Sequence, residues 1–199
     1  MLARSRQMLT DARSLLEGAG RLHPLRTRLL HLSEREMATV GWLWRGTKHP
    51  SVRRAAMLIS WLGNGVAYLL VAGILLAGTD GKVQLVALSG TGILICHLIY
   101  PWLKLACGRP RPFELRADLV SPLATLDRHS FPSGHVMTLT AAMVPFVVAA
   151  PAFLPFALLL WLAMAWSRIA CAHHYPSDVL AGGALGLVVS GALTSSIIG

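Results

Sequence analysis

The chain has 199 residues, of which 54% are hydrophobic and only 14% are charged, and its formal net charge is +9 at pH 7. A soluble domain usually has about 25% charged residues, so this composition excludes an ordinary soluble protein and predicts a single all-α domain embedded in a membrane. A basic segment beside apolar spans is typical of proteins that meet anionic lipid headgroups, so the lipid bilayer is the expected partner and nucleic acid is not.

The N-terminal segment, residues 1–54, has eleven Lys/Arg against four Asp/Glu, a net charge of +7. Within residues 12–48, leucines recur at helical spacing with arginines between them, which is typical of helices that lie on a membrane surface. Ser33 precedes Glu36 by three residues, a capping-box pattern that predicts the start of a second helix. We therefore expect interfacial amphipathic helices here and a basic amphipathic membrane-surface segment over residues 1–54.

The rest of the chain, residues 55–199, contains five apolar segments of roughly the length that crosses a membrane. The predicted fold is a polytopic membrane helix bundle with about five transmembrane helices plus the N-terminal interfacial amphipathic helices. Gly182 and Gly186 in the last segment either allow close helix packing or simply reflect a high content of small residues. The predicted spans are residues 56–78, 84–105, 135–150, 155–171 and 178–198.

The first polar cluster follows the second span in KLACGRPRP, residues 104–112. Lys104 ends the span, and Arg109 and Arg111 lie among a glycine and two prolines that stop the helix and favour a stiff turn. Such arginines either bind an anion or simply anchor the helix end, and this segment alone leaves both readings open.

The second polar cluster is PSGH, residues 132–135, directly before the third span. Ser133 is suited to the N-cap position, and Gly134 allows a ligand to approach the backbone closely. The free N–H groups and the dipole of a helix start attract an anion. The alternative is an ordinary capped helix with a surface histidine, His135.

The third polar cluster is SRIACAHHYPSD, residues 167–178. Arg168 falls at the end of the fourth span, where a charge is costly and is usually functional or paired. His174 and Asp178 are four residues apart, with Asp178 in the first turn of the fifth span, where its carboxylate can hold an imidazole in one tautomer. The alternative is a set of interfacial polar residues at a helix junction.

Because successive spans alternate in direction, all three clusters fall on the same side of the membrane as the N-terminal segment. Three cations and a helix N-terminus match the charge and the several oxygens of a phosphate. One histidine can attack phosphorus while the aspartate orients it, and the other can protonate the leaving alkoxide. The sequence has no carboxylate cluster suited to Mg²⁺ and its three cysteines show no CxxC spacing, so we expect no metal, no disulfide and no other cofactor.

These residues resemble the signature of the type 2 phosphatidic acid phosphatase family of membrane lipid phosphatases. That signature is a lysine, six residues and Arg-Pro, then Pro-Ser-Gly-His, then Ser-Arg, five residues, His, three residues and Asp. Residues 104–112, 132–135 and 167–178 match it in that order, and the resemblance covers roughly residues 56–198. The soluble vanadium-dependent haloperoxidases share this site architecture but match less well, because the helices here are long enough to span a membrane.

The resemblance implies an enzyme that hydrolyses a lipid phosphate monoester or diphosphate through a phosphohistidine intermediate without a metal, so that residues 55–199 form a transmembrane phosphatase core. His174 would be the nucleophile, Asp178 would orient it, and His135 would be the general acid. The residues expected to bind the substrate phosphate are Lys104, Arg111, Ser133, Gly134 and Arg168.

Two other functions remain open: a lipid phosphotransferase using the same intermediate, and a non-catalytic membrane protein that binds anionic lipid. The sequence does not rank the possible lipids. Many membrane members of the family have six spans, with the site facing away from the cytoplasm. Here the basic N-terminal segment on the same side as the site favours the cytoplasmic face of a bacterial inner membrane. The motifs assign no role to Asp127, Arg128, His129 or His173, and Arg109 is expected to recruit substrate or to anchor its loop.

Overall fold

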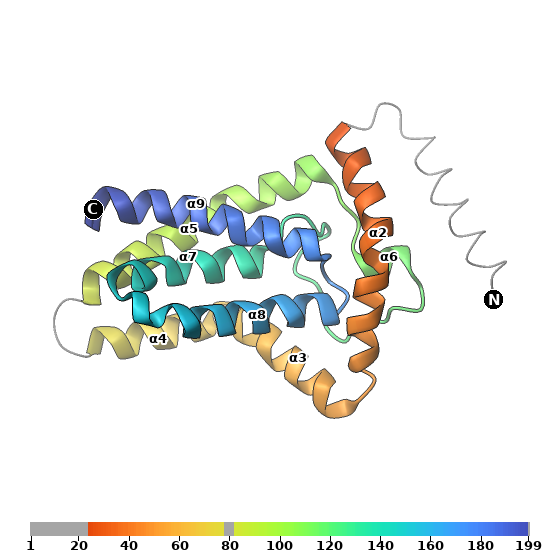
Figure 1. Ribbon diagram of the computed structural model, residues 1–199, viewed down its shortest axis with the longest axis horizontal. Helices are drawn as coiled ribbons and strands as arrows, with labels where there is room; N and C mark the ends of the chain where they lie inside the picture. Colours follow the sequence, from red (N-terminus) through yellow and green to blue (C-terminus); the bar gives the residue numbers. More distant parts are fainter. Residues whose placement is uncertain (1–23, 78–81, 199) are drawn as a thin grey trace.

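The structure, a computed structural model, describes residues 24–77 and 82–198, which form helices and no strand, as predicted. The helices are packed as a bundle, with one helix lying across its end (Figure 1). Their bounds are α2 (Pro24–Gly46), α3 (Pro50–Leu62), α4 (Val66–Ala77), α5 (Lys82–Cys107), α6 (Pro112–Leu115), α7 (Gly134–Ala149), the short 3₁₀ helix η1 (Pro151–Phe153), α8 (Leu154–Ala170) and α9 (Pro176–Ile198).

Three stretches in the described part of the chain are long and apolar enough to cross a membrane: Val83–Leu115, Pro151–Ala170 and Pro176–Ile197. The bent pair α3 and α4 makes a fourth if it is counted as one span. The remaining predicted span, α7, is apolar but has only 16 residues. The apolar helices and the all-helical bundle together define an integral membrane protein.

The first predicted span, residues 56–78, is broken rather than continuous: α3 and α4 are bent by 59°, and α3 begins already at Pro50. The break coincides with two glycines. Gly63 ends α3, and a Cβ there would come within 2.8 Å of the His135 ring and 2.6 Å of Met164. Gly65 has a φ of +104°, which side-chain-bearing residues rarely adopt. The glycines therefore let the helix break lie directly against His135.

The predicted start of a second N-terminal helix at Ser33 is wrong, because α2 runs without interruption through this residue. The Ser33 hydroxyl donates to the carbonyl of Leu29 at 2.9 Å, the bond of a serine inside a helix rather than of a cap. Val40 and Leu29 on the same helix are buried, so the inner face of α2 packs on the bundle. Residues 12–23, where the amphipathic pattern begins, lie outside the described part of the chain.

At the centre of the bundle, α7 packs against α5, α8 and α9. The two glycines of α9 explain the closest of these contacts. A Cβ on Gly182 would collide with the Ser133 carbonyl oxygen, and one on Gly186 would collide with that of Met137. Of the two readings of this glycine pair, close helix packing is therefore the correct one.

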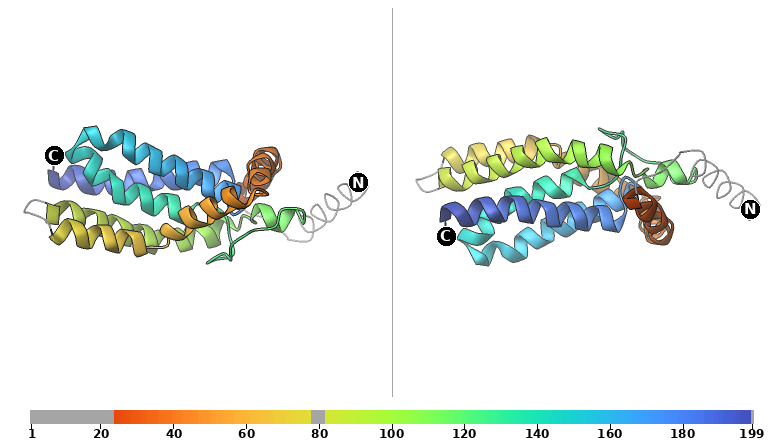
Figure 2. Two further views of the ribbon diagram at one scale, coloured as in Figure 1. Left: turned by 90° about the horizontal axis from the view of Figure 1, so that it is seen from below. Right: turned by 90° about the horizontal axis from the view of Figure 1, so that it is seen from above.

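The helices α5 and α8 end, and α7 and α9 begin, at the same end of the bundle (Figure 1). This arrangement brings the three polar clusters together, as span counting predicted. The helix α2 lies across this end, nearly perpendicular to the bundle helices (Figure 2). The C-terminal end of α9 lies at the opposite end of the bundle.

Candidate active site

Lys104 and Arg111 are buried at the end of α5 and at the start of α6. Lys104 donates to the Asp127 carboxylate at 2.9 Å and to the His129 carbonyl at 2.7 Å. Arg111 donates to the same Asp127 oxygen at 2.7 Å and to the His173 carbonyl at 2.9 Å. A single carboxylate oxygen therefore brings the two predicted phosphate-binding cations together.

Arg168 and Ser133 are also buried, and each has a polar atom without a hydrogen-bond partner among the described residues. Arg168 donates to the Ser60 hydroxyl through Nη1, while its Nε is unpartnered. Ser133 is at the N-cap position of α7, as predicted, but its hydroxyl makes no capping bond. Arg111 Nε is likewise unpartnered. Buried donors of this kind are costly unless satisfied, and phosphate oxygens are suitable acceptors for all three.

His174 lies in the turn between α8 and α9, and Asp178 lies in the first turn of α9, as predicted. Both side chains are buried, and His174 Nδ1 faces Asp178 Oδ2 at 3.5 Å. Burial lowers the pKa of His174 well below its ordinary value, and the positive charges of Arg111, Arg168 and Lys104 lower it further. His174 is therefore a neutral imidazole beside a carboxylate, within the electrostatic influence of the three cations.

His135 is in the first turn of α7, and its Nε2 lies 2.7 Å from Asn64 Oδ1 at the break between α3 and α4. His135 and Arg168 line a cavity of about 60 Å³. Two exposed apolar side chains, Trp61 and Leu126, line the same cavity. The cavity therefore joins the polar site to an apolar surface, and it lies where a bound phosphate would reach both His135 and Arg168.

Gly134, the last predicted phosphate-binding residue, begins α7. The backbone N–H of the preceding Ser133 donates to the Asp178 carbonyl at 3.0 Å, which ties the starts of α7 and α9 together. The structure therefore gathers all eight predicted site residues at one end of the bundle, where they come from α5, α7, α8, α9 and the connecting turns.

His173, the neighbour of His174, points away from Asp178. Its Nε2 lies 2.6 Å from the Ser121 hydroxyl and 3.1 Å from the Leu123 carbonyl. Burial, helped by Arg168 and Arg111, lowers the pKa of His173 to about 3. The side chain of His173 is a neutral group that contacts the loop over residues 116–133. His174, rather than His173, faces the Asp178 carboxylate and is therefore the better candidate nucleophile.

Sequence reasoning missed several residues that hold this site in place. Asp127, which the motifs leave without a role, bridges Lys104 and Arg111. Arg109 neither reaches outward nor anchors only its own loop; it forms ion pairs with Glu36 and Asp178. The partners of Arg109 and His135 lie about 70 residues away in the chain, and no local pattern connects residues so far apart.

The described residues contain no group of three or more His, Cys, Asp or Glu side chains placed to hold a metal ion. The three cysteines, Cys96, Cys107 and Cys171, are buried and free.

The model of the PAP2 superfamily matches residues 84–197, so the chain belongs to the PAP2 superfamily. Two similar proteins are each called decaprenylphosphoryl-5-phosphoribose phosphatase. The one from Mycobacterium tuberculosis is 36% identical over 115 residues, which cover 56% of this chain and 60% of that protein. The one from Mycolicibacterium smegmatis is 33% identical over 136 residues, which cover 67% of this chain and 72% of that protein.

A lipid A 1-phosphatase from Rhizobium johnstonii is 34% identical over 126 residues, which cover 56% of this chain and half of that protein. The fold is similar to the crystal structure of a transmembrane PAP2-type phosphatidylglycerolphosphate phosphatase from Bacillus subtilis. The TM-score is 0.52 with 21% identity, over 86% of this chain and 94% of the other. This likeness supports the transmembrane helical fold.

Proposed function

We propose that this protein is an integral membrane lipid phosphatase that hydrolyses a phosphate monoester or diphosphate headgroup through a phosphohistidine. The observation that carries the proposal is His174: a buried, neutral imidazole beside Asp178 and within the field of Lys104, Arg111 and Arg168. A neutral histidine is the form that can act as a nucleophile, and surrounding cations stabilise the charge of the transferring phosphoryl group.

In the first step the phosphate oxygens accept hydrogen bonds from the three cations, the Ser133 hydroxyl and the backbone at Gly134. His174 Nδ1 faces Asp178, which leaves Nε2 to attack phosphorus. The negative charge of the bound phosphate favours the imidazolium form of His135. The P–O bond to the lipid breaks, and this imidazolium gives one proton to the departing alkoxide. Asn64 holds the His135 ring for this transfer.

In the second step His135, now a neutral imidazole, takes a proton from a water molecule that attacks the phosphohistidine. The P–N bond breaks, inorganic phosphate forms, and both histidines return to their starting state. A phosphotransferase would differ only in the acceptor, an alcohol in place of water. We propose that residues 55–199 carry this chemistry and that residues 1–54 lie on the membrane surface.

A lipid is the proposed substrate because the cavity at His135 and Arg168 is also lined by exposed Trp61 and Leu126. Its volume of about 60 Å³ is small, so we expect it to take a headgroup phosphate while the apolar chain of the lipid stays outside. We propose a polyprenyl-linked phosphosugar as the first candidate substrate, and the names of the similar mycobacterial proteins support this choice.

The test is phosphate release by the purified protein from a panel of lipids in detergent micelles, with water as the sole acceptor. The panel contains a polyprenyl-linked phosphoribose, a polyprenyl phosphate, a polyprenyl diphosphate, phosphatidate and phosphatidylglycerol phosphate, each with and without EDTA. We expect turnover of at least one lipid, unaffected by EDTA and abolished in His174→Ala. No release from any lipid would refute the proposal, and loss of turnover in EDTA would refute the metal-free route.

We further propose that the site faces the cytoplasm from a bacterial inner membrane. The supporting observation is that α2, whose arginines belong to the basic N-terminal segment, lies across the same end of the bundle as the site (Figure 1). The C-terminal end of α9 lies at the opposite end of the bundle. A reporter enzyme that is active only outside the cytoplasm should therefore be active when fused after residue 199, and an inactive reporter would place the site on the outer face.

A further inference from the structure

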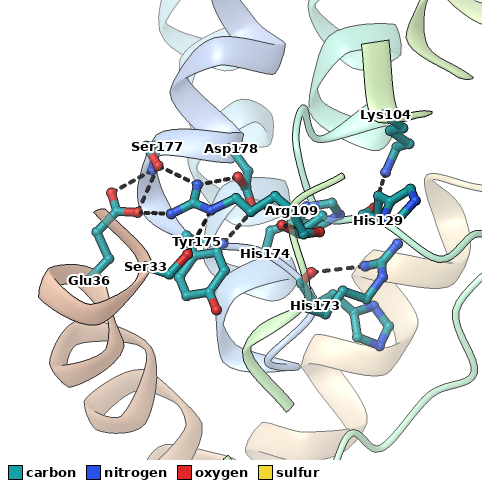
Figure 3. A network of polar contacts seen from close by, with 12 residues as sticks. Ser33, Glu36, Lys104, Arg109, His129, His173, His174, Tyr175, Ser177 and Asp178 are labelled. Carbon is teal, nitrogen blue, oxygen red and sulfur yellow. Dashed lines mark hydrogen bonds and ion pairs between the residues drawn. The ribbon is translucent and has the colours of Figure 1, made fainter. Parts of the chain in front are cut away.

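Arg109 lies beside the catalytic residues at the centre of a buried polar network (Figure 3). Its side chain is 0% exposed, and all three of its guanidinium nitrogens donate hydrogen bonds. Nη1 donates to Asp178 Oδ1 at 2.5 Å and to the Ser177 hydroxyl at 2.7 Å, Nη2 to Glu36 at 2.9 Å, and Nε to the Ser33 hydroxyl at 3.0 Å. The guanidinium is therefore directed at α2 and α9 rather than at the phosphate-binding donors.

The two oxygens of Asp178 have different partners. Oδ1 accepts from Arg109, while Oδ2 accepts from the backbone N–H of Tyr175 at 2.8 Å and faces His174 Nδ1. This two-point attachment fixes the rotation of the carboxylate, so that Oδ2 stays aimed at the imidazole. A positive charge also stabilises the ionised form of a carboxylate that is otherwise buried.

Glu36 of α2 holds Arg109 in turn. One carboxylate oxygen accepts from Arg109 and from the Ser177 hydroxyl, and the other accepts from the Ser177 backbone N–H at 2.9 Å. Glu36 thus satisfies a free N–H at the start of α9 and pairs with the arginine at the same time. The Arg109 guanidinium also lies 4.0 Å from the centre of the Tyr175 ring, which restricts its plane.

We propose that Arg109, held by Glu36 of the N-terminal helix, is a positioning residue that fixes Asp178 in its contact with His174. The catalytic consequence rests on the proposed function. The amphipathic helix α2 then completes the active site, because it supplies Glu36, the first carboxylate in the series of contacts Glu36–Arg109–Asp178–His174.

The test compares Arg109→Lys, Glu36→Gln and the double variant with wild type. Lysine keeps the charge but cannot reach Asp178 and Glu36 together in the planar geometry of a guanidinium. Arg116→Lys is the matched control, because Arg116 is a partly exposed arginine that pairs only with Asp118 among the carboxylates of the described residues. We expect kcat to fall on the order of 10- to 100-fold in Arg109→Lys, the range that a small misplacement of a catalytic group causes.

Because Lys104, Arg111 and Arg168 are untouched, KM and inhibition by inorganic phosphate should stay within about twofold of wild type in every variant. Glu36 acts through Arg109, so the double variant should be no slower than Arg109→Lys alone. An unchanged kcat in Arg109→Lys would overturn the inference while leaving the phosphatase proposal intact. A raised KM with weaker phosphate inhibition would also overturn it, because Arg109 would then be a substrate-binding residue.

A second readout needs no turnover and so stands even if no lipid is hydrolysed. In ¹⁵N-histidine NMR spectra the His174 signals, identified by their loss in His174→Asn, report which ring nitrogen carries the proton. We expect the Nδ1-protonated tautomer in wild type and Arg116→Lys, and a mixture of tautomers in Arg109→Lys. Identical His174 signals in all variants would refute a positioning role.

Discussion

Replacing Asp127 by asparagine removes the carboxylate that two proposed phosphate-binding side chains share. Asp127 Oδ1 accepts from Lys104 at 2.9 Å and from Arg111 at 2.7 Å. Burial by itself would raise the pKa of Asp127, but the two cations outweigh it and hold the pKa below its ordinary value. The carboxylate is therefore charged at neutral pH, and it competes with a substrate phosphate for the same donors.

The size of this competition follows from the contacts. A hydrogen bond to a charged group contributes about 1.5–3 kcal/mol when buried. The Asp127 side chain is 34% exposed, so solvent screening reduces each bond to about 0.5–1 kcal/mol. Asparagine still offers an acceptor oxygen but no charge, so both bonds weaken, by up to about 1–2 kcal/mol together, which is about 5- to 30-fold in affinity.

The assay is competitive inhibition of lipid dephosphorylation by inorganic phosphate. Asp127→Asn should lower the inhibition constant about 5- to 30-fold, by the energy derived above. Asp118→Asn is the control, because Asp118 lies in the same loop, is 62% exposed and pairs with Arg116 away from the site. Weaker inhibition in Asp127→Asn would show that this carboxylate holds the two cations in place rather than competing for them, and would refute the reasoning.

Three further predictions test the site and the helix packing. Ser133→Ala should raise the KM for the lipid phosphate about threefold to tenfold, the effect of losing one hydrogen bond. The melting temperature should not fall, because the buried hydroxyl makes no bond within the described residues. Gly186→Ala should destabilise the protein by about 1–3 kcal/mol through overpacking against α7, whereas Gly191→Ala, which meets only open space, should not. The pKa of His173 is about 3 in the folded protein and about 6.5 in an unfolded chain. Between pH 3 and pH 6.5, His173 is therefore protonated in the unfolded state but not in the folded state. Its contribution to stability is therefore complete above pH 6.5 and is lost as pH falls toward 3, by at most on the order of 4 to 5 kcal/mol. The melting temperature of His173→Gln should therefore fall less steeply with falling pH than that of wild type. The same pH dependence in both proteins would contradict the low pKa of His173.

The general fold, and the gathering of the candidate site residues at one end of the bundle, could be predicted because each depends on local signals. Apolar runs locate helices, and alternating spans place Lys104, His135 and His174 on one side without any knowledge of side-chain packing. The break in the first span also had a local signal, since Gly63 and Gly65 flank an asparagine, but the apolar content of the segment obscured it.

The contacts that hold the candidate site residues in place could not be predicted, because they join segments that are far apart in the sequence. The Ser33 and Glu36 pair matches a capping box, yet in the folded protein both side chains accept from Arg109 instead. Nothing near residue 36 indicates that its carboxylate will meet the start of α9, 141 residues later. Only the position of α2 across the end of the bundle brings these residues together.

The most direct test of the account is to locate the phosphoryl group during turnover. The protein is mixed with a lipid that it hydrolyses, the reaction is stopped within one turnover under alkaline conditions that preserve phosphohistidine, and the peptides are analysed by mass spectrometry. We predict a phosphoryl group on His174 in wild type, and neither phosphoenzyme nor phosphate release in His174→Ala. Full activity of His174→Ala, or a phosphoryl group on another residue, would contradict it.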